Sequence, residues 1–129
     1  MSINLNVTIK DGSLDVDQSG NANHVPKLAN PTMITWRLIG NAQGGVFNAI
    51  SAANPGFKWK GTQPPTGIFG DAVPDAQGNM TMVDNNINIQ GASGTWFYQL
   101  WATINGQQYS TITTLSPRAV THDPSIQNN

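Results

Sequence analysis

The dipeptide Asn105-Gly106 lies between two runs of β-forming residues, 95–104 and 107–115, and it constrains the fold strongly. A type I′ turn needs positive φ at both central positions, which Asn and Gly adopt at low cost. The sequence therefore predicts a hairpin with Ile104 opposite Gln107. Because opposed residues share a face, one face should be apolar and the other mixed. The predicted core face carries Trp96, Tyr98, Leu100, Ala102, Ile104 and Tyr109, and the mixed face carries Phe97, Gln99, Trp101, Thr103, Ser110 and Ile112.

Alternation of apolar and polar residues predicts further strands along the chain. Residues 3–9 alternate strictly, Asp11-Gly12 follows as a turn, and the alternation resumes at Leu14 and Val16. Residues 17–31 are predicted to form a loop, and residues 32–39 a strand near the middle of a sheet. Shorter alternating runs occur at 57–60, 80–82 and 86–90. We expect an all-β fold, a single-domain Ig-like β-sandwich of about seven to nine short antiparallel strands over residues 1–129.

Composition supports an all-β fold and restricts the classes of partner. The chain has 129 residues and no Glu, which helical proteins use heavily. It carries 13 charged residues against 44 uncharged polar ones, and its net charge is −1. This balance argues against binding to nucleic acid or to an anionic membrane surface. Because no secretory signal pattern and no long apolar run occurs, we expect a cytoplasmic protein by default.

The sequence contains no recognisable catalytic motif, so we expect no enzymatic activity and no cofactor. Cysteine is absent, and no Gly-x-Ser-x-Gly elbow is present. The glycine-rich run 40–45 lacks the lysine of a phosphate-binding loop. His24 and His122 are separated by about a hundred residues, a spacing that specifies no metal site.

The segment 15–23 resembles the start of an EF-hand calcium loop. Oxygen-bearing side chains stand at its odd positions and a glycine at position six. Position twelve is Pro26, where a bidentate Glu is needed, and an ordinary turn explains the same residues. Calcium therefore remains an alternative, with the ligands Asp15, Asp17, Ser19 and Asn21.

Aromatic residues suggest a carbohydrate-binding surface as an alternative function. Trp36 and Trp96 lie on predicted apolar faces, where burial is expected. Trp101 and Phe97 share the mixed face of the hairpin and would lie roughly 13 Å apart along the strand. Trp59, between two lysines, is the other aromatic residue expected to be exposed.

The chain ends in the pattern Asp-Pro-x-Ile-x-Asn over residues 123–128. With the segments 56–61, 82–86 and 96–100 in the same order, it resembles the DP-EP family of small bacterial β-sandwich proteins, and more distantly the PixA/AidA-type inclusion-body proteins. The resemblance covers about residues 3–129 and implies a bacterial sandwich, with no catalytic residues to carry over. The chain departs from it in having no Glu for a Glu-Pro element. A structural role is predicted for Asp123, Pro124 and Ile126, because proline fixes the backbone and the isoleucine can dock on the core.

Taken together, these features predict a non-enzymatic interaction or structural module. A surface with few charges and many amides weakens repulsion between copies, so we expect a protein partner or a homo-oligomer. The alternative is a small lectin-like protein that uses the surface aromatic residues.

Overall fold

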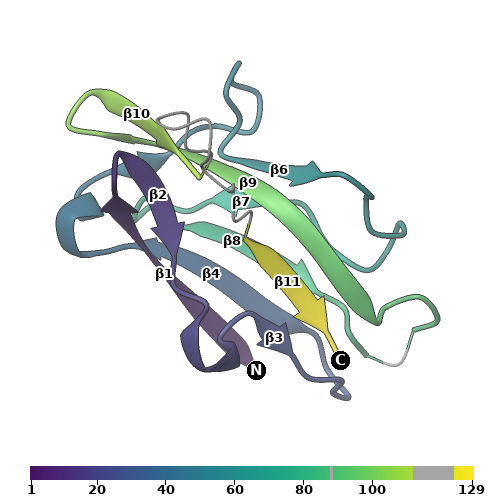
Figure 1. Ribbon diagram of the computed structural model, residues 1–129. Helices are drawn as coiled ribbons and strands as arrows, with labels where there is room; N and C mark the ends of the chain where they lie inside the picture. Colours follow the sequence, from purple (N-terminus) through teal and green to yellow (C-terminus); the bar gives the residue numbers. More distant parts are fainter. Residues whose placement is uncertain (88, 112–123) are drawn as a thin grey trace.

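Two β-sheets pack face to face in the computed structural model, which describes residues 1–87, 89–111 and 124–129 (Figure 1). One sheet has the order β2-β1-β4-β8-β7. Its strands are β1 (Ser2–Lys10), β2 (Ser13–Val16), β4 (Thr32–Leu38), β7 (Val73–Pro74) and β8 (Met80–Asp84). The second sheet contains β3 (His24–Val25), β5 (Val46–Phe47), β6 (Phe57–Lys60), β9 (Gly94–Ile104), β10 (Gln107–Ser110) and β11 (Ser125–Asn128).

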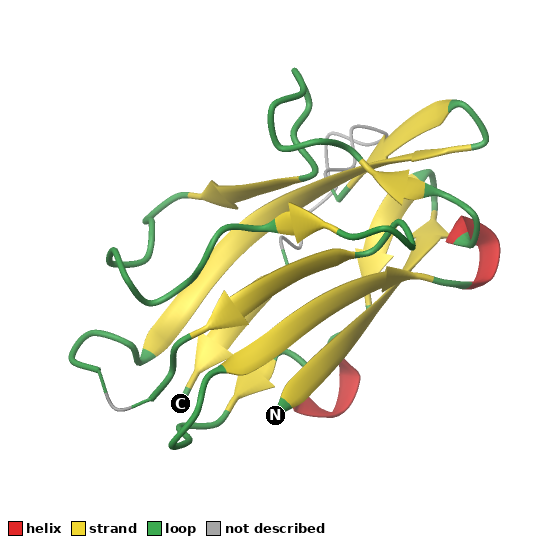
Figure 2. Ribbon diagram, turned by 180° about the vertical axis from the view of Figure 1, so that it is seen from behind, coloured by secondary structure: helices red, strands yellow, loops and turns green. Residues whose placement is uncertain are grey.

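Two short 3-10 turns, η1 (Ser19–Asn21) and η2 (Gly40–Ala42), connect strands at the margins of the sandwich (Figure 2). Both chain ends lie at the same end of the molecule, where β1 begins and β11 finishes. The predicted all-β sandwich is confirmed, and its Ig-like character stays a prediction.

The eleven-residue strand β9 organises the second sheet. Along one edge it pairs with β11 and β10, and along the other with β6 and β5. The predicted hairpin register is confirmed, since Gln107 lies opposite Ile104, and both Asn105 and Gly106 have positive φ. The strand after the turn ends at Ser110, and residues 112–115 of the predicted strand lie outside the described residues.

The prediction of purely antiparallel sheets is wrong for two strand pairs. β1 runs parallel to β4, with Leu5 opposite Trp36, and β11 runs parallel to β3. Parallel neighbours need a crossover of a dozen or more residues, and residues 11–31 provide one between β1 and β4. The alternation in the sequence sets which face each residue takes, but it carries no information on strand direction.

Two shorter segments also differ from the sequence prediction. The loop expected at 17–31 contains the short strand β3, which aligns beside the C-terminal strand β11. Of the alternating run at 86–90, the described residues form no strand. Asn86 takes a buried position there because its side-chain amide donates to the carbonyl oxygens of Val25 and Asn129.

Every member of the predicted core face of β9 is buried. The side chains of Trp36 on β4 and Tyr98 on β9 are fully buried between the sheets, and the Trp36 indole Nε1–H donates to the Tyr98 hydroxyl at 2.7 Å. Phe57 stacks on Tyr98 with ring centroids 5.2 Å apart. A hydrogen bond joins the two sheets here because an indole N–H buried without an acceptor would be costly.

We expect Tyr98→Phe to lower the free energy of unfolding by about 1–3 kcal/mol, because the buried Trp36 N–H loses its acceptor. Urea denaturation of both proteins measures the change. Tyr109→Phe is the matched control, because Tyr109 is half-buried and has no side-chain hydrogen bond in the described part of the chain. Equal losses in the two variants would show that the Trp36–Tyr98 bond is not the cause.

Candidate functional site

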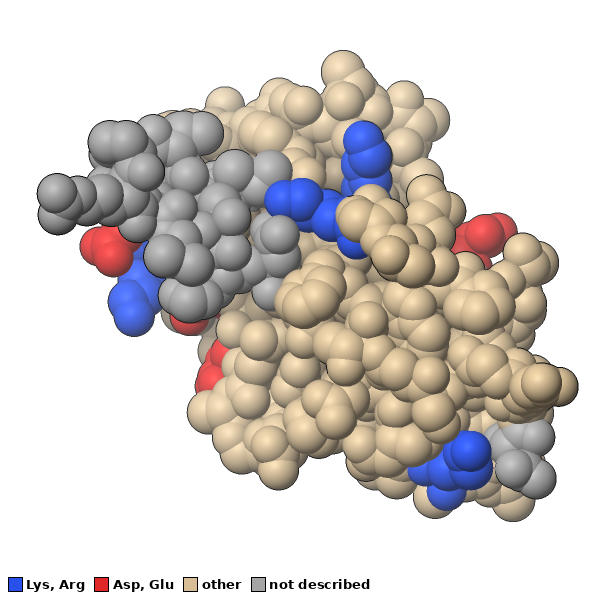
Figure 3. All heavy atoms as spheres, turned by 45° about the vertical axis from the view of Figure 1, so that its right-hand side comes forward, with Lys and Arg blue, Asp and Glu red and all other residues tan. Residues whose placement is uncertain are grey.

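The outer face of the second sheet carries the predicted mixed face of the hairpin. Phe97 is 47% exposed there, and Trp101, four residues further along β9, is half-buried. By register, Phe97 lies between Lys60 on β6 and Ser125 on β11. The charged atoms in Figure 3 are few and scattered over a mostly uncharged surface.

Trp59 does not belong to this surface, and the prediction that it is exposed is wrong. Trp59 alternates with the two lysines along β6, and its side chain packs against the core. The indole contacts Phe57 and Phe69 with ring centroids 4.9 Å apart in both pairs, so it is half-buried among aromatic rings. The two lysines suggested exposure, but the period of two places Trp59 on the opposite face from them.

The predicted calcium ligands lie in β2 and in the turn that follows it. Asp15 is an exposed strand residue opposite Thr8. The Asp17 Oδ1 accepts hydrogen bonds from the Ser19 hydroxyl at 2.6 Å and from the Ser19 backbone N–H at 2.9 Å, and these bonds lower the pKa of Asp17. This is the geometry of an Asx turn, and calcium binding stays a prediction.

The C-terminal motif contributes to the core through Ile126, which is 1% exposed and faces Trp96. Pro124 is buried, and its carbonyl oxygen accepts a hydrogen bond from the backbone N–H of Tyr98 at 3.0 Å. The predicted docking of Ile126 is confirmed. Asp123 and His122 lie outside the described residues.

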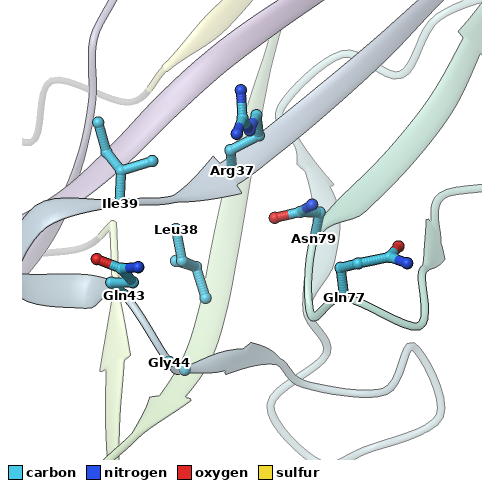
Figure 4. A pocket seen from close by; sticks show the side chains of 8 residues that line it. Arg37, Leu38, Ile39, Gln43, Gly44, Gln77 and Asn79 are labelled. Carbon is cyan, nitrogen blue, oxygen red and sulfur yellow. The ribbon is translucent and has the colours of Figure 1, made fainter.

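A polar pocket of about 330 Å³ lies where the end of β4 meets the loop before β5 and the turn between β7 and β8 (Figure 4). It is lined by Arg37, Leu38, Ile39, Gln43, Gly44, Gly45, Gln77 and Asn79. The last register pair of β4 and β8 joins Trp36 to Met80, so the next residues, Arg37 and Asn79, lie beside each other. Sequence reasoning did not find this pocket, because its residues come from three separate segments.

A slot of about 360 Å³, lined by mostly apolar side chains and by polar backbone atoms, opens beside the edge strand β6. Phe57 and Trp59 line it from the second sheet, and Met82 lines it from the first. Ile50, Gly70, Asp71 and Ala72 complete its walls. The slot therefore lies between the two sheets, on the side where the sandwich is open.

A buried polar cluster joins the sheets at the end that holds the C-terminus. Asp84 on β8 is 0% exposed, and its Oδ1 accepts a hydrogen bond from the side-chain amide of Asn128 on β11 at 3.0 Å. The Asn128 amide also donates to the Ala92 carbonyl oxygen at 2.9 Å. Among the residues that the structure describes, three buried side-chain oxygens have no hydrogen-bond partner: Asp84 Oδ2, Asn86 Oδ1 and Asn128 Oδ1.

Sequence reasoning missed this cluster, although a signal was present. Met80, Met82, Asp84 and Asn86 alternate on one face, so the core face of β8 continues into two polar residues. Within residues 1–87, 89–111 and 124–129, no three His, Cys, Asp or Glu side chains gather as metal ligands would.

Comparisons with protein-family models, curated proteins and solved structures gave no match. The resemblance to the DP-EP family therefore stays a prediction. In the described residues, no helix has the length and apolar character needed to cross a membrane.

The buried carboxyl of Asp84 predicts a pH dependence of stability. Burial raises the pKa of Asp84 to about 6, against a lowering effect of the bond from Asn128, whereas the ordinary value is 3.8. The folded protein therefore binds this proton more tightly than the unfolded chain. We expect the contribution of Asp84 to the free energy of unfolding to be highest below pH 4. This contribution should fall by up to about 3 kcal/mol as the pH rises above 6.

Asp84→Asn isolates this contribution, because the amide has a similar shape and cannot ionise. The difference between the wild-type and variant unfolding free energies, measured by urea denaturation from pH 4 to 8, should change over the interval 4–6. Asp71→Asn, at an exposed position, should keep the wild-type profile. A difference that does not vary with pH would contradict the prediction.

Proposed function

We propose that this protein is a non-enzymatic binding module that captures an extended polypeptide segment at the open edge of β6. The observation that carries the proposal is the slot with apolar side chains beside β6, a strand whose outer edge pairs with no other strand among the described residues. An added strand would take backbone hydrogen bonds from β6 and place an apolar side chain in the slot, as in known cases of strand addition.

The register supports this use of the edge. The Trp101 N–H donates to the Gly56 carbonyl oxygen at 3.2 Å, and antiparallel bonding alternates along a strand. The backbone groups of Lys58 therefore point toward β9, and those of Phe57 and Trp59 point away from it. Outward-pointing backbone groups are what a new strand pairs with.

The slot supplies side-chain selectivity. Phe57 and Trp59 are on the core-facing side of β6, so alternate residues of an added strand would lie next to them. The side chains that line the slot are apolar apart from Asp71, which is exposed. A segment that alternates apolar and polar residues therefore fits, with its apolar residues toward the slot.

Charge on β6 favours a foreign segment over a second copy of the same strand. In an antiparallel β6–β6 pair that keeps the faces aligned, Lys58 lies opposite either itself or Lys60. Like charges directly opposed across a strand pair are destabilising. An acidic residue on the outer face of a partner strand would instead complement Lys58, which is exposed.

We expect a synthetic peptide Asn-Val-Asp-Leu-Asp-Val-Asn to bind and to protect the backbone N–H groups of Phe57 and Trp59 from hydrogen exchange. Ala72→Leu fills the slot and should weaken binding about tenfold or more, the value of one buried apolar side chain. Ala53→Leu, in an exposed turn, is the matched control and should bind as the wild type does.

A peptide of the same composition with its Val and Leu residues consecutive should bind more weakly, because it cannot keep one face apolar. Equal protection by both peptides would contradict the proposal. A dimer that forms with rising concentration and protects the same two N–H groups would overturn the choice of a foreign partner.

The exposure of Phe97 favours a second candidate function, the binding of a linear carbohydrate on the outer face of the second sheet. An aromatic ring that is half exposed on a flat sheet can stack on a sugar ring, and Gln99 between Phe97 and Trp101 offers hydrogen bonds to hydroxyl groups.

We expect cellohexaose to change the tryptophan fluorescence if this surface binds sugars, and Phe97→Ala to remove the change. Met33→Ala, an exposed position on the other sheet, should leave it intact. If the oligosaccharide changes neither the fluorescence nor the melting temperature of the wild-type protein, this second candidate function is wrong.

A further inference from the structure

The buried polar cluster between β8 and β11 contains more acceptors than donors. The side chains of Asp84, Asn86 and Asn128 are all buried, and each has one oxygen without a hydrogen-bond partner among the residues that the structure describes. A buried polar oxygen without a donor is costly. The cluster therefore needs a donor that these three side chains do not supply while Asp84 is ionised.

The side-chain amides in the cluster already use their own donors. The Asn128 amide nitrogen donates to Asp84 Oδ1 at 3.0 Å and to the Ala92 carbonyl oxygen at 2.9 Å. The Asn86 amide nitrogen likewise donates to two backbone carbonyl oxygens. Exchanging the oxygen and nitrogen of either amide would place oxygen against oxygen, so both amide orientations are determined by these bonds.

The surroundings of Asp84 disfavour a negative charge on its carboxyl group. Its neighbours by pairing are Thr32 on β4 and Phe69, and the second sheet contributes Asn128, none of which is titratable. The carboxyl group at Asn129, whose oxygen accepts two side-chain hydrogen bonds, would add a second negative charge at this end. Within the described residues no Lys, Arg or His pairs with Asp84. A buried carboxylate without a cation is strongly disfavoured relative to the neutral acid.

From these contacts we infer that Asp84 and Asn128 form a proton-dependent clasp on the C-terminal strand β11, in which Asp84 Oδ2 carries a proton and donates it to Asn128 Oδ1. A carboxylic acid and an amide are both planar and carry a donor beside an acceptor, so the two groups can form a pair of hydrogen bonds. The bond from Asn128 to Asp84 Oδ1 is the first of the pair. The proton gives both unpaired oxygens a partner and removes the buried charge. This inference is independent of strand addition at β6.

Loss of the proton would open the end of β11. Burial raises the pKa of Asp84 to about 6, so the proton leaves as the pH rises through that value, and opening lets the carboxylate reach water. Ile126, which is 1% exposed, holds the strand before the clasp, so we expect only the residues after it to open. The backbone N–H groups of Gln127 and Asn129 report this opening, because they donate to carbonyl oxygens at 3.0 and 3.1 Å in the closed state.

Hydrogen exchange at the N–H groups of Gln127 and Asn129 from pH 4 to 8 tests the clasp. After correction for the intrinsic effect of pH, we expect their protection to fall by up to about a hundredfold, since the proton affinity of the closed and open states differs by about two pH units. Asp84→Asn keeps a donor for Asn128 and cannot ionise, so its protection should vary by less than about twofold. Asp71→Asn, at an exposed position, is the matched control and should follow the wild type.

Exchange in low concentrations of urea separates local opening from global unfolding. The N–H of Ile39, which bonds to the Val7 carbonyl oxygen, belongs to the first sheet and should exchange only through larger openings that urea promotes. The N–H groups of Gln127 and Asn129 should be less protected than that of Ile39 and respond little to urea. Equal protection and equal urea dependence at all three groups would overturn the clasp.

The position of the proton is tested by a pH titration of the wild-type protein, followed by the ¹³C signals of the side-chain carboxyl and amide carbons. We expect Asp84 and Asn128 to share a midpoint of about pH 6, with a smaller change at Asn86. A midpoint near 4 for Asp84, or a larger change at Asn86 than at Asn128, would overturn the assignment. Protection at pH 8 that is restored by sodium or calcium chloride would show that a cation takes the place of the proton, which would also overturn it.

Discussion

The backbone of β9 is the constraint on which the second sheet depends, because one strand supplies hydrogen bonds to four others. Its first residues pair with β11 and its last with β10 along one edge, while β6 and β5 share the other edge. The same strand carries the core side chains on one face and Phe97 and Trp101 on the other. A change that displaced β9 would therefore disturb the pairing, the core and the exposed aromatic surface together.

Buried hydrogen bonds help to fix how the two sheets face each other, and two of them join side chains across the core. The Trp36–Tyr98 bond lies among packed aromatic rings, and the Asp84–Asn128 bond lies at the end near the C-terminus. Hydrophobic burial has no direction, whereas a buried hydrogen bond is satisfied in one alignment and costly in others. These bonds thus favour one alignment of the two sheets over others. Because one Asp84 carboxyl oxygen has no hydrogen-bond partner, the contact at that end of the sandwich depends on whether Asp84 is protonated.

The sequence predicted features that depend on neighbouring residues and missed those that depend on distant ones. The Asn105-Gly106 turn and the period of two were sufficient for the hairpin register and for the core face of β9, because both are local. The parallel pairing of β1 with β4 depends on the path of a crossover, and composition contains no record of it. The pocket beside Arg37 was missed because its residues come from three segments that are separate in the sequence. Trp59 was predicted to be exposed because lysines flank it in the sequence. The period of two along β6 instead places its side chain on the face opposite those lysines.

The β6 edge and the pocket beside Arg37 lie at different kinds of boundary, and this follows from how the strands of a sandwich are paired and where they end. Backbone groups within a sheet are paired, so unpaired ones remain at an edge strand such as β6. Where a strand ends, the chain leaves the sheet, and side chains from several loops can converge without breaking the pairing, as around Arg37. With 13 charged residues in the whole chain, long-range electrostatic attraction contributes little to binding at either place. Binding at this surface therefore depends on contacts at short range, such as the backbone groups of an edge strand and the side chains beside it.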